Sequence, residues 1–186
     1  LLYQHAGGYP QGAYVSEDSP YRYFLQFHNE NAWPFNDSYD GWWGHATLPK
    51  LNYEESPELY QYILGIAKKW VSAPFGADGW RLDVVDEYPD ELVRMIRQAA
   101  RAEKPDALII GEVWEDASCK EAYGEHRQYL MGHELDSVMN YPLRQTILDF
   151  LLRGDGTAFR LRLWELLEHY PRPCWDVMMN LLSSHD

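Results

Sequence analysis

The sequence predicts an α/β fold in which short buried strands alternate with amphipathic helices. From residue 56 onward, apolar segments of strand length follow stretches whose apolar residues recur at helical spacing. Three of these apolar segments stop at an acid, namely Asp83, Glu112 and Asp186. A parallel α/β barrel displays its catalytic groups in this way, at the ends of its strands. An unpaired charge is costly to bury, so acids in these places indicate chemistry.

The composition is that of a globular protein, with 46% hydrophobic and 24% charged residues in a chain of 186. The net charge of −13 argues against a nucleic-acid partner, whose phosphates require a basic surface, and is compatible with a neutral ligand such as a sugar. Two cysteines, Cys119 and Cys174, form neither a disulfide framework nor a metal-ligand spacing. The chain has no apolar run long enough to span a bilayer.

The first fifty residues lack periodicity and are rich in Tyr, Trp, Gly, Asn and Pro, which is typical of an irregular segment. The regular pattern begins at Ser56, which can cap a helix, followed by Pro57 and Glu58 in its first turn. Helical spacing then continues to Trp70, where the first expected helix ends.

The remaining elements alternate in type along the chain. We expect strands at 79–85, 107–113, 135–140 and 177–182, helices at about 89–102, 142–152 and 157–169, and a polar loop over about 115–132. Four strands alternating with helices predict a parallel sheet. Glu112 lies one strand-helix-strand unit after Asp83, so both acids should lie at neighbouring strand ends and face one pocket.

Four segments carry a family resemblance. Residues 79–83 read G-x-R-x-D, residues 111–114 read G-E-V-W, residues 184–186 read S-H-D, and residues 48–52 read L-P-K-L-N. The first three segments, in this order, resemble the α-amylase superfamily of glycoside hydrolases. Residues 48–52, which precede them in the chain, resemble a motif of its neopullulanase, cyclomaltodextrinase and maltogenic amylase branch. The resemblance implies a partial (β/α)8 TIM barrel, about strands four to seven, over 53–186. Residues 1–52 would then be part of the irregular subdomain inserted after the third barrel strand.

The resemblance also implies the roles of the acids. Cleavage of a glycosidic bond requires one carboxyl that protonates the leaving oxygen and another that attacks the anomeric carbon or activates water. By resemblance, Asp83 is the nucleophile and Glu112 is the general acid and then the base. Asp186 is the third carboxylate, which binds sugar hydroxyls. The family retains the anomeric configuration, so the reaction is a double displacement.

Four further residues are candidates for substrate binding. Arg81 precedes Asp83 by two positions, so both side chains point to one strand face and the guanidinium can keep Asp83 ionised; the alternative is a structural salt bridge. His185 matches a family histidine that hydrogen-bonds the sugar. Glu87, with its neighbour Asp86, would contact the aglycone side. Trp114 either stacks on an acceptor sugar or packs in the core.

The expected function is therefore a retaining hydrolase that acts on α-glucans such as maltooligosaccharides, cyclodextrins, pullulan and starch. Two alternatives stay open: an α-1,6-glucosidase or transglycosylase of the same superfamily, and a catalytically inactive carbohydrate-binding homologue. The expected partner is an α-glucan, without nucleic acid or membrane, and a homo-oligomer remains an option. No cofactor is expected, although the full-length protein has room for calcium. The expected location is cytoplasmic.

The chain begins at Leu1 without an initiator Met and ends at a motif residue, Asp186. We therefore expect it to be a piece of a longer protein, with a D-x-x-x-x-N-H motif shortly upstream of Leu1. A complete eight-stranded barrel needs about 250 residues. We accordingly expect residues 1–186 to show no glycosidase activity alone.

Overall fold

The structure, a computed structural model, describes residues 12–185. Its internal contacts divide the chain into two compact units, Leu1–Ile63 and Leu64–Asp186, each of which is described by itself. The division falls inside the first long helix, α1 (Pro57–Val71). The expected domain boundary at 52/53 came from the family resemblance, and it stays a prediction.

The described part of the first unit is irregular up to residue 56, as the composition predicts. It contains two short 3-10 helices, η1 (Arg22–Phe24) and η2 (Trp42–Gly44), and two isolated bridges that join Phe27 to Tyr39 and Gly41 to Pro49. A small aromatic core holds it together, formed by Ala13, Leu25 and Tyr39 with Tyr14, Tyr21, Phe27 and Leu51 packed against them. Helix α1 then begins where its cap predicts, because the Leu59 N–H donates to Ser56 Oγ over 3.2 Å.

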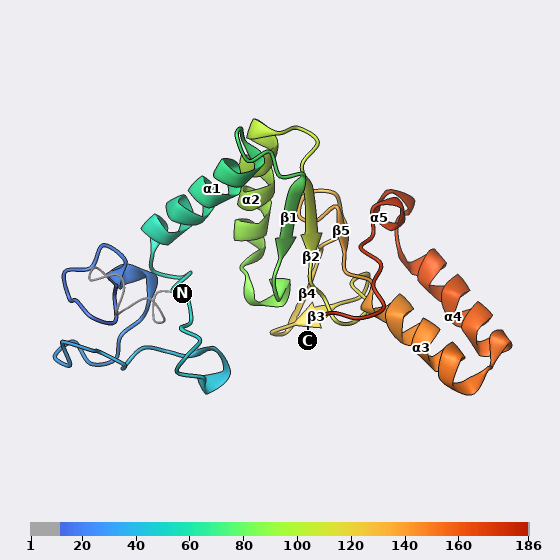
Figure 1. The fold of residues 1–186 in the computed structure, drawn as a ribbon, viewed down its shortest axis with the longest axis horizontal. Helices are drawn as coiled ribbons and strands as arrows, with labels where there is room; N and C mark the ends of the chain where they lie inside the picture. Colours follow the sequence, from blue (N-terminus) through green and yellow to red (C-terminus); the bar gives the residue numbers. More distant parts are fainter. Residues whose placement is uncertain (1–11, 186) are drawn as a thin grey trace. The chain divides into compact units, whose positions relative to one another are not determined.

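A three-stranded parallel sheet organises the second unit (Figure 1). Its order is β1 (Gly79–Leu82), β2 (Leu108–Gly111) and β5 (Ser137–Val138), and Leu82 pairs with Gly111 at the carboxyl ends of β1 and β2. The backbones of β1 and β2 approach each other closely at Gly79. A glycine is required there because a Cβ would collide with the carbonyl oxygen of Leu108. The sheet thus places the ends of β1 and β2 side by side.

The expected strands are shorter in the structure than in the sequence pattern. The strand predicted at 79–85 ends at Leu82 because Val84 adopts left-handed backbone angles, and a 3-10 helix, η3 (Val85–Glu87), follows. The segment predicted as a strand at 177–182 contributes one parallel bridge, between Met139 and Met179. Helix α5 (Arg172–Asp176) precedes that segment and was not predicted.

The longer helices follow the predicted periodicity. Helix α2 (Asp90–Glu103) links β1 to β2 and buries the expected apolar face, consisting of Leu92, Val93, Ile96 and Ala99 together with Ala100. Helices α3 (Tyr141–Arg153) and α4 (Gly156–His169) form a hairpin, in which Gly154 takes the left-handed angles that end α3 and Asp155 caps α4. None of the helices in residues 12–185 is both long and apolar enough to cross a bilayer.

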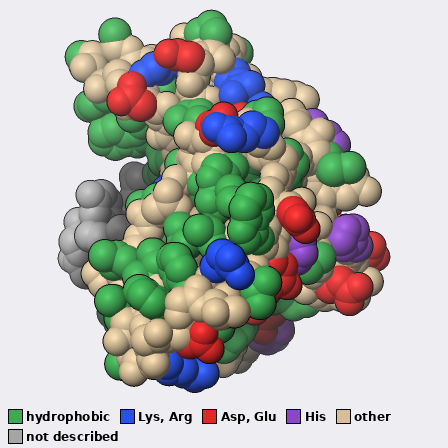
Figure 2. Space-filling model, turned by 90° about the vertical axis from the view of Figure 1, so that its right-hand side faces the viewer, with side chains coloured by type: hydrophobic (Ala, Val, Ile, Leu, Met, Phe, Trp, Pro, Cys, Tyr) green, Lys and Arg blue, Asp and Glu red, His purple; other side chains and the backbone are tan. Residues whose placement is uncertain are grey.

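Large hydrophobic side chains are exposed on the α3–α4 hairpin. They include Leu151, Leu152, Leu161 and Trp164, each at least 60% exposed. Figure 2 faces this end of the molecule and shows hydrophobic side chains gathered on it. A gathered apolar surface of this kind is typical of interaction sites.

An ion cluster ties α2 to the sheet at the amino ends of its strands. Asp136 precedes β5, is largely buried, and accepts a 2.9 Å hydrogen bond from the backbone N–H of Ile109 through Oδ2. Its Oδ1 lies 2.7 Å from Arg97 Nη1 and 2.9 Å from Arg101 Nη2. If Asp136 lost its charge but kept an oxygen that accepts hydrogen bonds, Arg97 and Arg101 would lose their counter-charge. Arg97 is also largely buried, so its unpaired charge would be costly.

We therefore expect Asp136→Asn to lower the free energy of unfolding by about 2–3 kcal/mol, since removing one partner of a buried pair leaves uncompensated charge. The measurement is urea unfolding of the full-length protein. A matched control is Asp176→Asn, which breaks the exposed pair with Arg172 and should lower the free energy of unfolding far less. Equal losses in the two variants would contradict a structural role for the Asp136 cluster.

Candidate active site

Two acids lie at the carboxyl ends of adjacent parallel strands. Asp83 follows β1 directly, and Glu112 follows β2. The Glu112 N–H donates to the Leu82 carbonyl over 2.9 Å, and the Glu112 carbonyl accepts from Val85 N over 3.2 Å. The ladder between β1 and β2 therefore continues past both strands and fixes the backbone on which each acid is carried.

One guanidinium joins the two acids. Arg81 Nη1 donates to Asp83 Oδ1, and Arg81 Nη2 lies 2.8 Å from Glu112 Oε1. Arg81 Nε points to Met139 Sδ, 3.3 Å away at the end of β5. Burial disfavours the charged guanidinium, but the hydrogen bond to Asp83 and the charge of Glu112 outweigh it, so the pKa of Arg81 is raised. Arg81 thus stays cationic between two carboxylates.

Glu112 lies in a buried, donor-rich setting. Its side chain is 2% exposed. Oε2 accepts a 2.8 Å hydrogen bond from Val84 N, while Oε1 accepts from Trp114 Nε1 at 3.2 Å and from Tyr141 OH at 3.3 Å. Every contact therefore fixes the orientation of Glu112.

Asp83 has the opposite environment, because its side chain is 69% exposed. An exposed carboxylate beside a guanidinium is available to an approaching ligand. Tyr88 lies near it: burial and the charge of Asp83 both raise the pKa of this phenol. Two neighbouring carboxyls with such different exposure suit different roles, one as a held proton carrier and the other as an accessible carboxylate.

Val84, between Asp83 and η3, is strained. It has φ 41° and ψ 61°, a conformation that a β-branched residue rarely adopts. This turn presents its backbone N–H to Glu112 Oε2. Strain of about 1–3 kcal/mol per residue persists where the surroundings fix it, and such positions cluster at functional sites.

The structure brings together four of the residues that the sequence analysis selected, namely Arg81, Asp83, Glu112 and Trp114. Glu87 lies in η3 on the same end of the sheet, with its carboxylate joined to Tyr123 OH. His185 is within the described residues and is exposed. Asp186, the third predicted acid, lies outside the described residues, so its position stays a prediction.

Sequence reasoning missed two residues of this cluster, one that contacts Glu112 and one that contacts Arg81. Tyr141 donates to Glu112, and Met139 contacts Arg81. Met139 follows β5 directly, and Tyr141 begins α3 two residues later. Their signal was available, because the sequence predicts a strand over 135–140 in the same sheet, and side chains at its carboxyl end should reach the same site.

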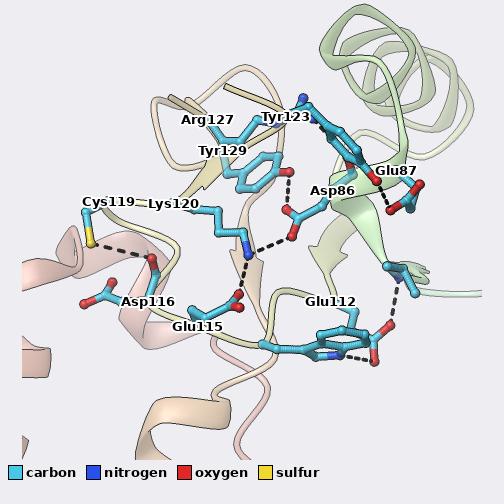
Figure 3. A network of polar contacts seen from close by, with 12 residues as sticks. Asp86, Glu87, Glu112, Glu115, Asp116, Cys119, Lys120, Tyr123, Arg127 and Tyr129 are labelled. Atoms are coloured by element: carbon cyan, nitrogen blue, oxygen red, sulfur yellow. Dashed lines mark hydrogen bonds and ion pairs between the residues drawn. The ribbon is translucent and has the colours of Figure 1, made fainter. Parts of the chain in front are cut away.

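A network of charges surrounds the loop that follows β2 (Figure 3). Lys120 Nζ forms ion pairs with Glu115 and, at 3.0 Å, with Asp86 Oδ2. Tyr129 OH donates to Asp86 Oδ1 over 2.7 Å. Burial disfavours the Lys120 ammonium, but these carboxylates outweigh it and raise its pKa. The Asp86 carboxylate, which we expected to touch the aglycone, is thus engaged in holding this loop.

No metal-ligand group is visible in the described residues: among 12–185, no three His, Cys, Asp or Glu side chains are grouped so that they could hold an ion. A calcium site in the longer protein stays a hypothesis.

The sequence matches the family model described as "Alpha amylase, catalytic domain" over residues 9–186. It is 41% identical over 141 residues to a cyclomaltodextrinase of Geobacillus thermopakistaniensis. This match covers 75% of this chain and 22% of that protein. It is 35% identical over 167 residues to the intracellular maltogenic amylase of Bacillus subtilis, which covers 89% of this chain and 26% of that protein. The chain therefore spans about a quarter of the length of these curated relatives.

Solved structures give the same assignment. The ligand-free cyclic α-maltosyl-(1→6)-maltose hydrolase of Arthrobacter globiformis superposes with a TM-score of 0.78 at 30% identity. The match covers 96% of this chain and 39% of that one. These similarities confirm the resemblance to the cyclomaltodextrinase and maltogenic amylase branch that the four sequence motifs indicated.

Proposed function

Because the chain belongs to the α-amylase catalytic-domain family, we propose that its parent protein is a retaining glycoside hydrolase that cleaves α-glucosidic bonds in α-glucans. One observation carries the proposal: the Arg81 guanidinium contacts both the exposed Asp83 carboxylate and the buried Glu112 carboxyl at adjacent strand ends. Double displacement requires two carboxyls beside the scissile bond, one as nucleophile and the other as general acid and then base.

In the proposed reaction, Glu112 gives a proton to the glycosidic oxygen while an Asp83 carboxylate oxygen attacks the anomeric carbon. The bond to the leaving sugar breaks and a glycosyl ester forms at Asp83. Glu112 then takes a proton from water, whose oxygen attacks the same carbon and releases Asp83. Arg81 Nη1 donates a hydrogen bond to Asp83 Oδ1 and so orients this carboxylate. Asp186 and His185 are proposed to bind sugar hydroxyls beside this carbon.

The family fold gives the sheet a place in a larger architecture. The catalytic domain of this family is a TIM barrel, and the chain is part of one. We propose that β1, β2, β5 and the segment at Met179 are barrel strands four to seven, within a partial barrel at 53–186. Residues 1–52 are proposed as part of the inserted subdomain. The outer edge of β1 has no strand partner within 12–185, so we expect no glycosidase activity from residues 1–186 alone.

The proposed substrates are maltooligosaccharides, cyclodextrins, pullulan and starch. The named cyclomaltodextrinase relative supports the cyclodextrins, and the maltosyl-(1→6)-maltose hydrolase supports the alternative of an α-1,6-glucosidase or transglycosylase. The presence of Asp83 and Glu112 in one cluster weighs against an inactive sugar-binding homologue. A cytoplasmic location is proposed from the intracellular maltogenic amylase among the relatives.

A trapping experiment tests the proposed nucleophile. We expect a slow fluorinated glucosyl substrate to leave a covalent ester on Asp83 of the full-length protein, because this carboxylate is exposed and is oriented by its contact with Arg81. Mass spectrometry of the labelled peptide locates the ester, and Asp83→Asn serves as the control without a nucleophile. Label on a different carboxylate in the wild-type protein would remove Asp83 from this role.

A further inference from the structure

A short hairpin stands in the loop where the sequence indicated only polar coil. It pairs β3 (Glu121–Ala122) with β4 (Glu125–His126) in antiparallel register, so Tyr123 and Gly124 form a two-residue turn. Both turn residues have positive φ, 56° at Tyr123 and 80° at Gly124. Such turns favour Asn, Asp or Gly at the first position. A tyrosine there is unfavourable for the turn itself, which indicates a use for its side chain.

The hairpin is anchored on both flanks to the segment that carries Asp83. On one flank Lys120 pairs with Asp86. On the other flank Arg127 forms an ion pair with Asp90, and its Nη2 donates to the Asp86 carbonyl over 2.9 Å. The Arg127 N–H also donates to the Lys120 carbonyl over 2.8 Å and closes the base of the hairpin. Figure 3 shows these side chains converging on Asp86. The hairpin tip is therefore held in place.

The tip carries an aromatic ring to the catalytic end of the sheet. Tyr123 OH donates to Glu87 Oε1, and Glu87 lies four residues after Asp83. The Tyr123 residue is nevertheless 71% exposed, and Trp114, two residues after Glu112, is 46% exposed. A tyrosine that served only packing would bury its ring, since burial of apolar surface is what stabilises such contacts. Here the hydroxyl is bound to Glu87, while most of the residue is exposed.

We propose that Tyr123 is an acceptor-binding residue, whose ring stacks on the sugar that enters after the first displacement. Its hydroxyl orients the Glu87 carboxylate toward a hydroxyl of that sugar. This inference rests on the proposed function and adds a specificity element to it. In the second half-reaction an acceptor hydroxyl gives its proton to Glu112 and its oxygen bonds to the anomeric carbon. The ester bond to Asp83 breaks, and a longer glucan leaves.

The test measures transfer against hydrolysis in the full-length protein. Maltotriose serves as donor and added glucose as acceptor, and the two products are quantified across a glucose series. Tyr123→Asn removes the ring and suits the left-handed turn, so the hairpin should still form. We expect this variant to raise the glucose concentration for half-maximal transfer about tenfold, which corresponds to about 1.4 kcal/mol. Tyr123→Phe keeps the ring, loses the bond to Glu87, and should raise it about two- to threefold.

A matched control is Glu125→Ala, which alters an exposed residue of the same hairpin and should leave that concentration unchanged. An unchanged half-maximal concentration in Tyr123→Asn overturns the inference and leaves the proposed function standing, because the wild-type protein still hydrolyses maltotriose. Hydrolysis without transfer by wild type at any glucose concentration also overturns it. A wild-type protein that cleaves none of the α-glucans overturns the proposed function instead, and this inference with it.

Discussion

Replacing Glu112 with glutamine should lower turnover of maltooligosaccharides by the full-length protein by about 10²–10⁴-fold or more. The amide cannot protonate the leaving oxygen, nor can it accept a proton from water in the second step. The carbonyl oxygen of the amide can still accept from Val84 N or Trp114 Nε1, so the fold should survive. Steady-state kinetics, with thermal unfolding measured in parallel, check both parts of the expectation.

A substrate with a good leaving group separates acid catalysis from structural damage. A dinitrophenyl glycoside departs without needing a proton, so Glu112→Gln should slow its first step far less than it slows maltotriose cleavage. Glu165→Gln on α4, an exposed residue paired with Arg162, is the control and should leave both rates unchanged. Equal losses on the two substrates would show that Glu112 acts by some means other than proton donation.

Removing the Arg81 guanidinium should have the second largest effect. In Arg81→Met the buried Glu112 carboxyl loses a cation 2.8 Å away, and Asp83 loses its hydrogen-bond donor. Breaking a buried pair costs about 3 kcal/mol at the lower end, which corresponds to about a hundredfold in rate if the cost falls on the transition state. We expect kcat/KM for maltotriose to fall by about that factor, together with a loss of stability.

Arg81→Lys distinguishes charge from geometry. A lysine ammonium is a point charge and cannot contact both carboxyls as the planar guanidinium does. The lysine variant should therefore recover stability more completely than activity, and its pH–rate profile should shift relative to wild type. Urea unfolding and kcat/KM across pH measure the two quantities. Full activity in Arg81→Lys would show that bridging Asp83 and Glu112 is not what Arg81 contributes.

The parts that could be predicted from the sequence are those set by local pattern. The spacing of apolar residues predicted α2, α3 and α4 nearly to their ends, because α2 buries one apolar face and the side chains of Asn140 and Asp155 cap the starts of α3 and α4. The acids were found because a carboxyl at the end of an apolar segment is unusual, and because parallel strands bring such ends to one edge. The pairing of Leu82 with Gly111 then places Asp83 beside Glu112.

The parts that could not be predicted depend on contacts between distant residues. The β3–β4 hairpin has strands of two residues each, too short and too polar for a period to appear. Its position comes from Lys120 and Arg127, whose partners Asp86 and Asp90 lie more than thirty residues earlier. The early end of β1 likewise depends on Val84, whose left-handed angles contradict its intrinsic preference for extended backbone.

The turn at Val84 also determines which experiments can detect how Glu112 is held. The group that donates a hydrogen bond to Glu112 Oε2 is the main-chain N–H of Val84. No replacement of the valine side chain removes this N–H, so an alanine scan would not detect its contribution. Proline would remove the N–H but would also force φ to a negative value. Only an ester in place of that amide, introduced by semisynthesis, removes the one hydrogen while leaving the chain trace in place. A map of the site drawn from side-chain mutagenesis alone would therefore omit one of the groups that hold Glu112.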